Sequence, residues 1–194
     1  MLGGAQQPHG PANRSIVGLL TTGDHPPLTT LCPMATSEPG TAQAAAVAWL
    51  QAVLDRGDLL AAWAACDPVL RLVLAQDWVW TNRHHPAIGH ERDWDEIAQG
   101  LAANPPESEL WRRFATDLVG TWQQTWKGFD TRRWQVAPAP EVVDLDVEMV
   151  SFTERPTGFT RRFAMRHTGA GWVMASVDGD LRYEPGWPPR LAQP

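Results

Sequence analysis

The spacing of apolar positions along the chain changes once, near residue 134. Before that point apolar residues recur every three to four positions, which is typical of amphipathic helices, and after it they alternate, which is typical of strands. The pattern therefore predicts an α+β fold in which helices come first and an antiparallel sheet packs against them. The expected helices cover 41–56, 58–65, 68–82, 93–103 and 107–127.

Capping residues mark where the expected helices begin. Thr41, Asp58 and Asp93 each stand directly before an apolar periodic run, where a side-chain oxygen can accept a hydrogen bond from a free backbone N–H. Asp67 is followed by Pro68, whose missing N–H costs nothing at the first helical position. These residues predict the helix starts independently of the apolar spacing.

Three alternating runs predict the strands. They cover 141–152, 159–168 and 171–178, and the connectors at 155–158 and 169–171 are short enough for hairpins. Consecutive hairpins predict an antiparallel meander.

The charges and apolar residues of the first two runs predict their register. Pairing Asp146 with Arg166 brings opposite charges together on one face and collects apolar side chains on the other. Two polar residues, Arg161 and His167, share the apolar face in this register. The apolar residues on that face are Val143, Leu145, Val147, Met149, Phe163, Met165, Val173, Ala175 and Val177.

Arg161 and His167 are the candidate catalytic residues. An imidazole titrates near neutral pH and can act as a general acid or base, and a guanidinium can hold an anionic or enolate oxygen. The alternative is structural: His167 bonds a backbone carbonyl at one end of the sheet, and Arg161 extends into solvent at the hairpin end. The sequence leaves both interpretations open.

Four tryptophans are candidates for the wall of a ligand pocket. Trp49 and Trp63 lie on the first two expected helices. Trp78 and Trp80 are two residues apart, so they share a face only if 78–81 is a short strand, which competes with the helix over 68–82. The alternative for each of the four is core packing, which is favoured because burying a large side chain stabilises a fold by roughly 1.5–3 kcal/mol.

No metal or cofactor site is predicted. His84, His85, His90 and Glu91 carry suitable donor atoms, but adjacent imidazoles diverge and the His-Glu-x-x-His helix pattern is absent. The chain also lacks a P-loop, a Rossmann glycine pattern and a Gly-x-Ser-x-Gly elbow.

Composition narrows the classes of partner. Sixteen basic and 22 acidic side chains give a formal charge of −6, which argues against a nucleic-acid binder with a basic face. No run approaches the roughly 20 apolar residues that cross a membrane. The chain has only two cysteines, too few for a disulfide framework, so we expect a cytoplasmic protein.

The two ends of the chain differ from its middle. Residues 1–40 are rich in Pro, Gly, Ser and Thr without a helical or strand period, which predicts a disordered segment, and Met34 is an alternative start. Residues 183–194 form a Pro-rich tail, in which we expect Trp187 to lie across the sheet edge. The folded domain is expected over 41–182.

The order of elements over 41–182 resembles the NTF2-like superfamily, which includes SnoaL-like and ketosteroid-isomerase-like proteins. The most similar pieces are the turn Arg56-Gly57-Asp58 and the hairpin Gly169-Ala170-Gly171-Trp172. The resemblance implies a curved sheet wrapped around helices into a cone with an apolar pocket, and a homodimer through the outer sheet face. Isomerases and epoxide hydrolases of the family hold a carboxylate inside the cone, whereas the acids of the two longest runs here are expected outside it.

These patterns agree with two functions. The first is a noncatalytic module that binds a small apolar molecule or a protein partner, because the expected inward face is poor in acids. The second is a cofactor-free isomerase, cyclase or dehydratase that uses His167 as acid or base and Arg161 to hold an anion.

Overall fold

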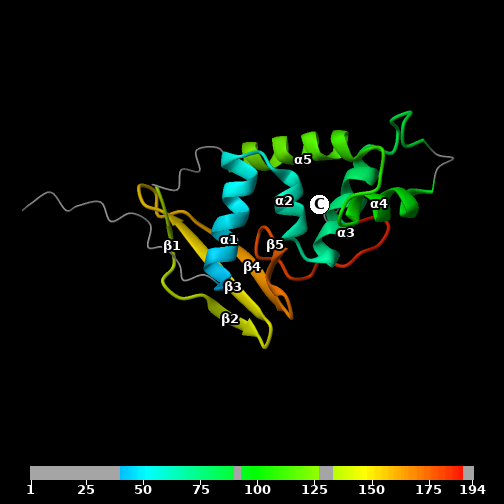
Figure 1. Cartoon of the computed structure of the whole chain (residues 1–194). Coiled ribbons are helices and arrows are strands. Elements are labelled where there is room, and N and C mark those ends of the chain that lie inside the picture. The colour runs from blue at the N-terminus through cyan, green and yellow to red at the C-terminus, as the bar shows by residue number, and fades with distance from the viewer. Residues whose placement is uncertain (1–39, 90–92, 127–132, 190–194) are drawn as a thin grey trace, which may run out of the picture. The chain divides into compact units, whose positions relative to one another are not determined.

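The computed structural model describes residues 40–89, 93–126 and 133–189. In these ranges five α-helices precede a five-stranded antiparallel sheet (Figure 1), which confirms the expected α+β fold. The helices are α1 (Ala42–Leu50), α2 (Leu59–Ala64), α3 (Pro68–Thr81), α4 (Trp94–Ala102) and α5 (Trp111–Thr125). None of the described helices is long and apolar enough to cross a membrane.

The capping residues act as expected. The side chain of Thr41 accepts a hydrogen bond from the N–H of Ala44 at 3.2 Å, and that of Asp58 accepts one from the N–H of Ala61 at 3.1 Å. Asp93 accepts bonds from the first turn of α4. The first helix differs from the expected one in its last turn, because Gln51–Asp55 widens into a π-helical turn before the chain reverses.

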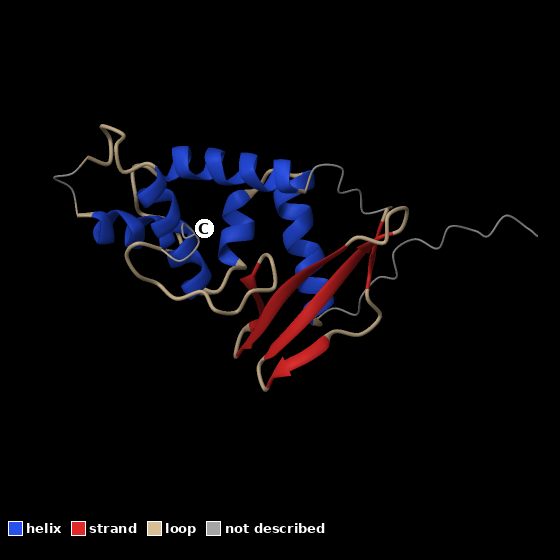
Figure 2. Ribbon diagram, turned by 180° about the vertical axis from the view of Figure 1, so that it is seen from behind, coloured by secondary structure: helices blue, strands red, loops and turns tan. Residues whose placement is uncertain are grey.

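The strands are β1 (Trp134–Val136), β2 (Glu141–Asp144), β3 (Val147–Glu154), β4 (Thr160–Thr168) and β5 (Gly171–Ser176). Their order in the sheet is β1-β3-β4-β5. Strands β1 and β2 both pair with the edge of β3 that faces away from β4, β1 at the end of β3 and β2 at its start. Helix α1 packs against β3, β4 and β5, and α5 runs past the ends of α1 and α2 that point away from the sheet (Figures 1 and 2).

The expected single strand over 141–152 is wrong, because the chain turns at its middle. Residues 145 and 146 form the turn of a β2–β3 hairpin, and the carboxylate of Asp144 accepts a hydrogen bond from the N–H of Leu145 at 2.7 Å. An Asp side chain that bonds the following backbone favours such a turn. Leu145 therefore projects into solvent at the tip of the hairpin instead of pointing to the core.

The expected register is also wrong, by one residue. Arg166 pairs with Val147, not Asp146, and Val150 pairs with Phe163. The reason is that β3 is apolar on both faces, and this register turns Phe152 toward the helices, where its ring packs edge-on against Phe163 at 5.3 Å. Most residues expected on the inward face lie elsewhere: Val147 and Met149 form a small cluster with Ala164 and Ala175 on the opposite face, while Val143 and Leu145 are exposed.

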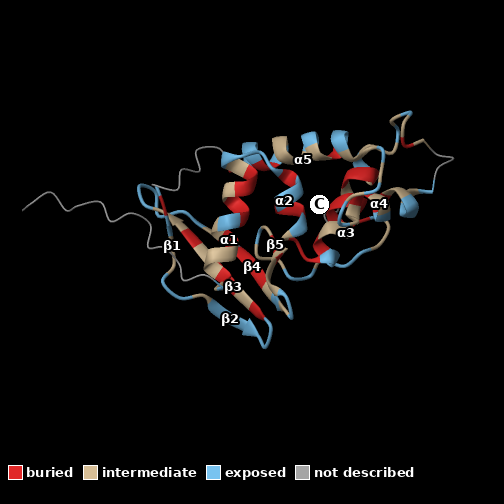
Figure 3. Ribbon diagram, in the orientation of Figure 1, coloured by how far each residue is buried: buried red, intermediate tan, exposed pale blue. Residues whose placement is uncertain are grey.

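The main core lies between the helices and the inward face of the sheet (Figure 3). Aromatic rings fill much of it: Trp49 packs edge-on against Trp122 at 4.8 Å, and Trp63 packs against Phe114 at 5.2 Å. Strand β5 contributes Met174 and Trp172 to this core, where Val173 and Ala175 were expected. The space between α1 and the sheet is therefore occupied by the chain's own side chains.

Candidate functional site

Two of the tryptophans proposed for a pocket wall are fully buried core residues. The indole N–H of Trp49 donates to the sulfur of Cys66 at 3.3 Å, and that of Trp63 donates to the carbonyl of Leu101 at 3.1 Å. Each ring thus has its polar atom satisfied and its faces packed, as expected for buried tryptophans.

The other two tryptophans point to different places. Helix α3 continues through Thr81, so the competing strand over 78–81 is not formed and the two rings do not share a face. Trp78 is buried and donates to Asp117 at 2.9 Å. Trp80 is half-buried, with the guanidinium of Arg83 over its ring at 4.5 Å and Trp94 at 5.9 Å.

Arg161 points toward the helices, but its charge is already engaged. Its Nη2 donates to the carbonyl of Thr125, at the last turn of α5, at 2.7 Å, and its guanidinium lies 4.5 Å from the Trp126 ring centre. A cation at a helix C-terminus is favourable because the last carbonyls carry partial negative charge. Partial burial lowers the pKa of Arg161. These contacts fit a residue that fixes the end of α5.

His167 lies at the far end of the same strand. Its side chain is exposed, with Trp172 edge-on at 5.0 Å, and its backbone N–H donates to the carbonyl of Asp146 at 2.6 Å. Arg161 and His167 are six residues apart, which is about 20 Å along a strand. The structure does not bring these two side chains to one substrate-sized site.

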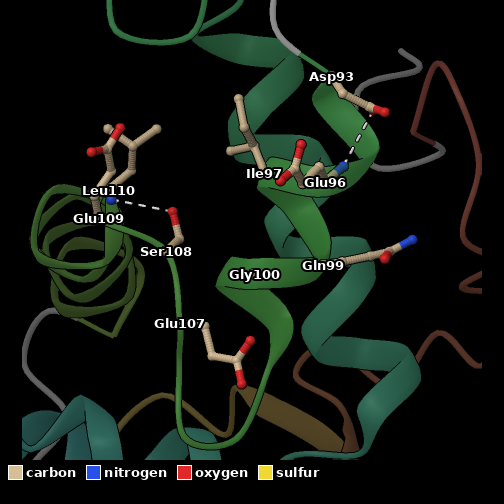
Figure 4. A pocket seen from close by; sticks show the side chains of 9 residues that line it. All are labelled: Asp93, Glu96, Ile97, Gln99, Gly100, Glu107, Ser108, Glu109 and Leu110. Atoms are coloured by element: carbon tan, nitrogen blue, oxygen red, sulfur yellow. Dashed lines mark hydrogen bonds between the residues drawn. The ribbon is translucent and has the colours of Figure 1, made fainter.

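A hollow of about 750 Å³ lies beside α4, at a place where the sequence predicted no site. Figure 4 shows α4 on one side and the 107–110 segment on the other. Four carboxylates line it with two apolar and three small or neutral polar residues: Asp93, Glu96, Ile97, Gln99, Gly100, Glu107, Ser108, Glu109 and Leu110. The hollow is therefore acidic and distant from the expected apolar cavity between helices and sheet.

The hollow is shaped by a close crossing at Gly100. The carbonyl of Gly100 accepts the N–H of Glu107 at 2.9 Å, which brings Ser108 across α4. A Cβ at position 100 would meet the Cβ of Ser108 at 3.4 Å, an ordinary van der Waals contact, so the crossing does not require glycine. Ser108 then bonds the N–H of Leu110 just before α5 begins. Sequence reasoning missed this arrangement because its residues come from two segments separated by a break at 103–106.

No metal site is found in the described part of the chain. No group of three or more His, Cys, Asp or Glu side chains there is arranged to hold an ion. His84 and His85 belong to the loop after α3, and His85 contacts the guanidinium of Arg113. His90 and Glu91 lie outside the described residues.

One edge of the sheet is covered by the chain itself. The N–H of Met174 in β5 donates to the carbonyl of Ala65 at 2.8 Å, and the N–H of Asp67 donates to the carbonyl of Met174 at 2.8 Å. The Asp67 carboxylate accepts a bond from Arg166 at 2.8 Å and another from the N–H of Val69, where it caps α3. Both backbone groups of Met174, at the centre of this edge, thus have partners.

The opposite edge, formed by β2, is open within the described ranges. Among the described residues, no backbone hydrogen bond joins β2 to a segment other than β3, and every residue of β2 is exposed (Figure 3). Val142 and Val143 are 71% and 47% exposed, and Leu145 at the hairpin tip is 104% exposed. We call Val142, Val143 and Leu145 the apolar tip.

Comparison with known families finds no family model that matches this chain, and comparisons with curated proteins and with solved structures find no match either.

Proposed function

We propose that this protein is a noncatalytic protein-binding module of the NTF2-like kind, which takes an extended basic segment of a partner protein along β2. The observation that carries the proposal is the open edge of the sheet, where the apolar tip lies beside strand backbone that no described segment other than β3 pairs with. An extended peptide that adds a strand gains main-chain hydrogen bonds from such an edge and specificity from alternate side chains.

The charge around the apolar tip favours a basic partner. Glu141, Asp144 and Asp146 surround the exposed valines and the leucine. Glu141 and Asp146 have arginine neighbours only at 3.8 and 3.7 Å, and all three carboxylates are well exposed. Arg162 and Arg166 offset part of this charge, but Arg166 is shared with Asp67, so carboxylates remain in excess around the apolar tip. An approaching arginine or lysine is attracted by this excess, which raises the rate of association.

The same charges disfavour the homodimer expected from the NTF2-like resemblance, if it formed through this edge. Antiparallel pairing of two β2 strands about their centre sets Glu141 of one copy against Asp144 of the other. Like charges directly opposite each other destabilise a strand pair. We therefore choose a partner segment over a second copy as the occupant.

Two features support a noncatalytic role and the NTF2-like kind. Arg161 is engaged by α5 and His167 lies about 20 Å away, so the only acid–base scheme suggested by the sequence has no common site. Helices that precede an antiparallel sheet, with α1 packed on β3, β4 and β5, agree with the order and packing that the resemblance implies.

The test uses a fluorescein-labelled eight-residue peptide in which arginine and valine alternate, with fluorescence anisotropy as the readout. We expect it to bind the full chain, and we expect Val142→Lys to weaken binding at least about tenfold, because a lysine adds like charge to the contact. Leu60→Lys is the matched control, since Leu60 is an exposed apolar residue on α2. A glutamate–valine peptide should not bind.

Three results would overturn the proposal. The first is no binding of the basic peptide. The second is loss of binding in Glu96→Lys with none in Val142→Lys, which would place the peptide in the acidic hollow. The third is a dimer in sedimentation equilibrium that Val142→Lys dissociates, which would make a second copy the occupant.

A further inference from the structure

The C-terminal tail docks on helices instead of the sheet edge where we expected Trp187. Figure 1 shows the segment after β5, in red, running beside α3 and α4. Residues 181–186 form neither helix nor strand, and Trp187 packs against the ring of Trp94 at 5.8 Å. The docked part of the tail is Tyr183–Pro189, with Pro189 buried at its end.

Two hydrogen bonds give this docking its specificity. The N–H of Gly186 donates to the side-chain oxygen of Gln76, a residue of α3 that is only 4% exposed. The indole N–H of Trp187 donates to the carboxylate of Asp95 in the first turn of α4 at 2.6 Å. A buried amide oxygen without a partner is costly, so Gln76 favours a backbone N–H at this place.

Aromatic rings form the rest of the surface. Trp94 lies between Trp187 and Trp80, edge-on to Trp80 at 5.9 Å, and its own N–H is held by the carbonyl of Gly89 at 3.0 Å. The ring that receives Trp187 is thus fixed by the loop after α3. Aromatic surfaces with a few fixed acceptors are a common way to bind Pro-rich segments, because such segments lose little entropy on binding.

We propose that this α3–α4 surface is a recognition site for an extended Gly-Trp-Pro-Pro segment, occupied in the resting protein by the chain's own tail, and that it accepts a segment of the same chemistry from outside. We call it the tail site and define it by Gln76, Trp80, Trp94 and Asp95. The tail is an intramolecular competitor, and an external ligand binds when it displaces the tail.

The form of the tail makes such an exchange feasible. It has no strand or helix of its own. Hydrogen bonds to the side chains of Gln76 and Asp95 hold it, together with the packing of Tyr183 and Trp187. Segments of this kind open at lower free energy than the core. A short tether supplies an effective concentration of about 1 mM or more, so the docked tail should weaken any external copy.

The test uses the full chain and a fluorescein-labelled peptide with the sequence of residues 183–190, Tyr-Glu-Pro-Gly-Trp-Pro-Pro-Arg. We expect the peptide to bind Trp187→Ala at least about tenfold more tightly than the unaltered protein, because the variant tail no longer competes. Adding Asp95→Ala to Trp187→Ala should remove this binding. A peptide with alanine in place of its tryptophan is the matched control and should bind neither protein.

A second measurement needs no variant. Hydrogen exchange of residues 183–189 in the unaltered protein should accelerate when unlabelled peptide is added in excess, whereas exchange of α1 should not change. The inference fails if folded Trp187→Ala, judged by an unchanged circular dichroism spectrum, binds the peptide no better than the unaltered chain. If that variant does not fold, unchanged exchange of 183–189 under excess peptide overturns the inference.

Discussion

The two edges of the sheet are built in opposite ways. At the β5 edge, residues 65–67 bond both backbone groups of Met174, and the Asp67 carboxylate joins the start of α3 to Arg166 of β4. At the β2 edge, four exposed residues and an exposed hairpin tip face outward. Unpaired edges invite further strands, so proteins usually cover or charge them. This protein covers one edge and surrounds the other with carboxylates.

The difference shows where the stability of the sheet lies. The covered edge links the sheet to the helices through a carboxylate that serves as helix cap and ion-pair partner together. The open edge contributes little to the fold, which leaves its side chains available for binding. Substitutions at the two edges should therefore differ in size.

Asp67→Ala should have the largest effect, a loss of about 2 kcal/mol in the free energy of unfolding. About 1 kcal/mol comes from the lost cap of α3, and a similar amount from the lost partner of Arg166, which is discounted because the arginine is partly exposed. Urea denaturation measures the change. Asp67→Asn is the matched control: asparagine also caps helices, so it should lose only about half as much. Equal losses in both variants would refute the double role of Asp67.

The helical part could be predicted from sequence because its signals are local. Thr41, Asp58, Asp67 and Asp93 fix helix starts through bonds to residues two or three positions away, and the structure confirms all four caps. The ion pair of Asp67 with Arg166 joins residues 99 positions apart, and no local pattern predicts it.

The sheet was predicted in kind but not in detail. Alternation runs unbroken through the β2–β3 turn, so Leu145 looks like a strand residue, and Asp144 is the only local signal of the turn. The predicted register is wrong because Val147 and Val150 are both apolar and lie on opposite faces of β3. Either face of this strand could therefore pack against the helices, and apolar alternation does not distinguish the two registers.

The candidate sites escaped sequence reasoning for a related reason. The acidic hollow and the tail site each combine residues from separate segments, such as Gln76 with Gly186. Arg161 and His167 do share a face of β4, as expected, but the alternation that groups them says nothing of their separation along the strand.

Cys66 offers an intermediate test of the covered edge, because it lies in the segment that pairs with Met174. Burial raises the pKa of its thiol from 9.0 to about 12. Between these values the folded state keeps the proton and the unfolded state loses it, so the free energy of unfolding falls as pH rises above about 9. The loss due to this group should reach ~1.4 kcal/mol at pH 10.

Urea denaturation at pH 8 and pH 10 measures how much Cys66 contributes to the pH dependence of the free energy of unfolding. Cys66→Ala should be less stable than the unaltered chain at pH 8, because the substitution leaves a small cavity. Between pH 8 and pH 10, however, the variant should lose less stability than the unaltered chain, and the difference is the loss caused by ionisation of the thiol. The burial-raised pKa of Tyr183 affects both proteins and cancels in this comparison. The same pH dependence in both proteins would mean that the covered edge leaves Cys66 accessible to solvent.

Leu145→Ser should have the smallest effect, a change of no more than about 0.5 kcal/mol in the free energy of unfolding. Leu145 is fully exposed at the hairpin tip, so its removal costs no buried apolar area. Thermal and urea unfolding at several protein concentrations measure it. A loss above about 1 kcal/mol that grows with protein concentration would show that a second copy covers Leu145 in solution. If the edge is open for a different protein, the free energy of unfolding should change little and should not depend on protein concentration. The reason is that such a partner stabilises the fold only when it is bound.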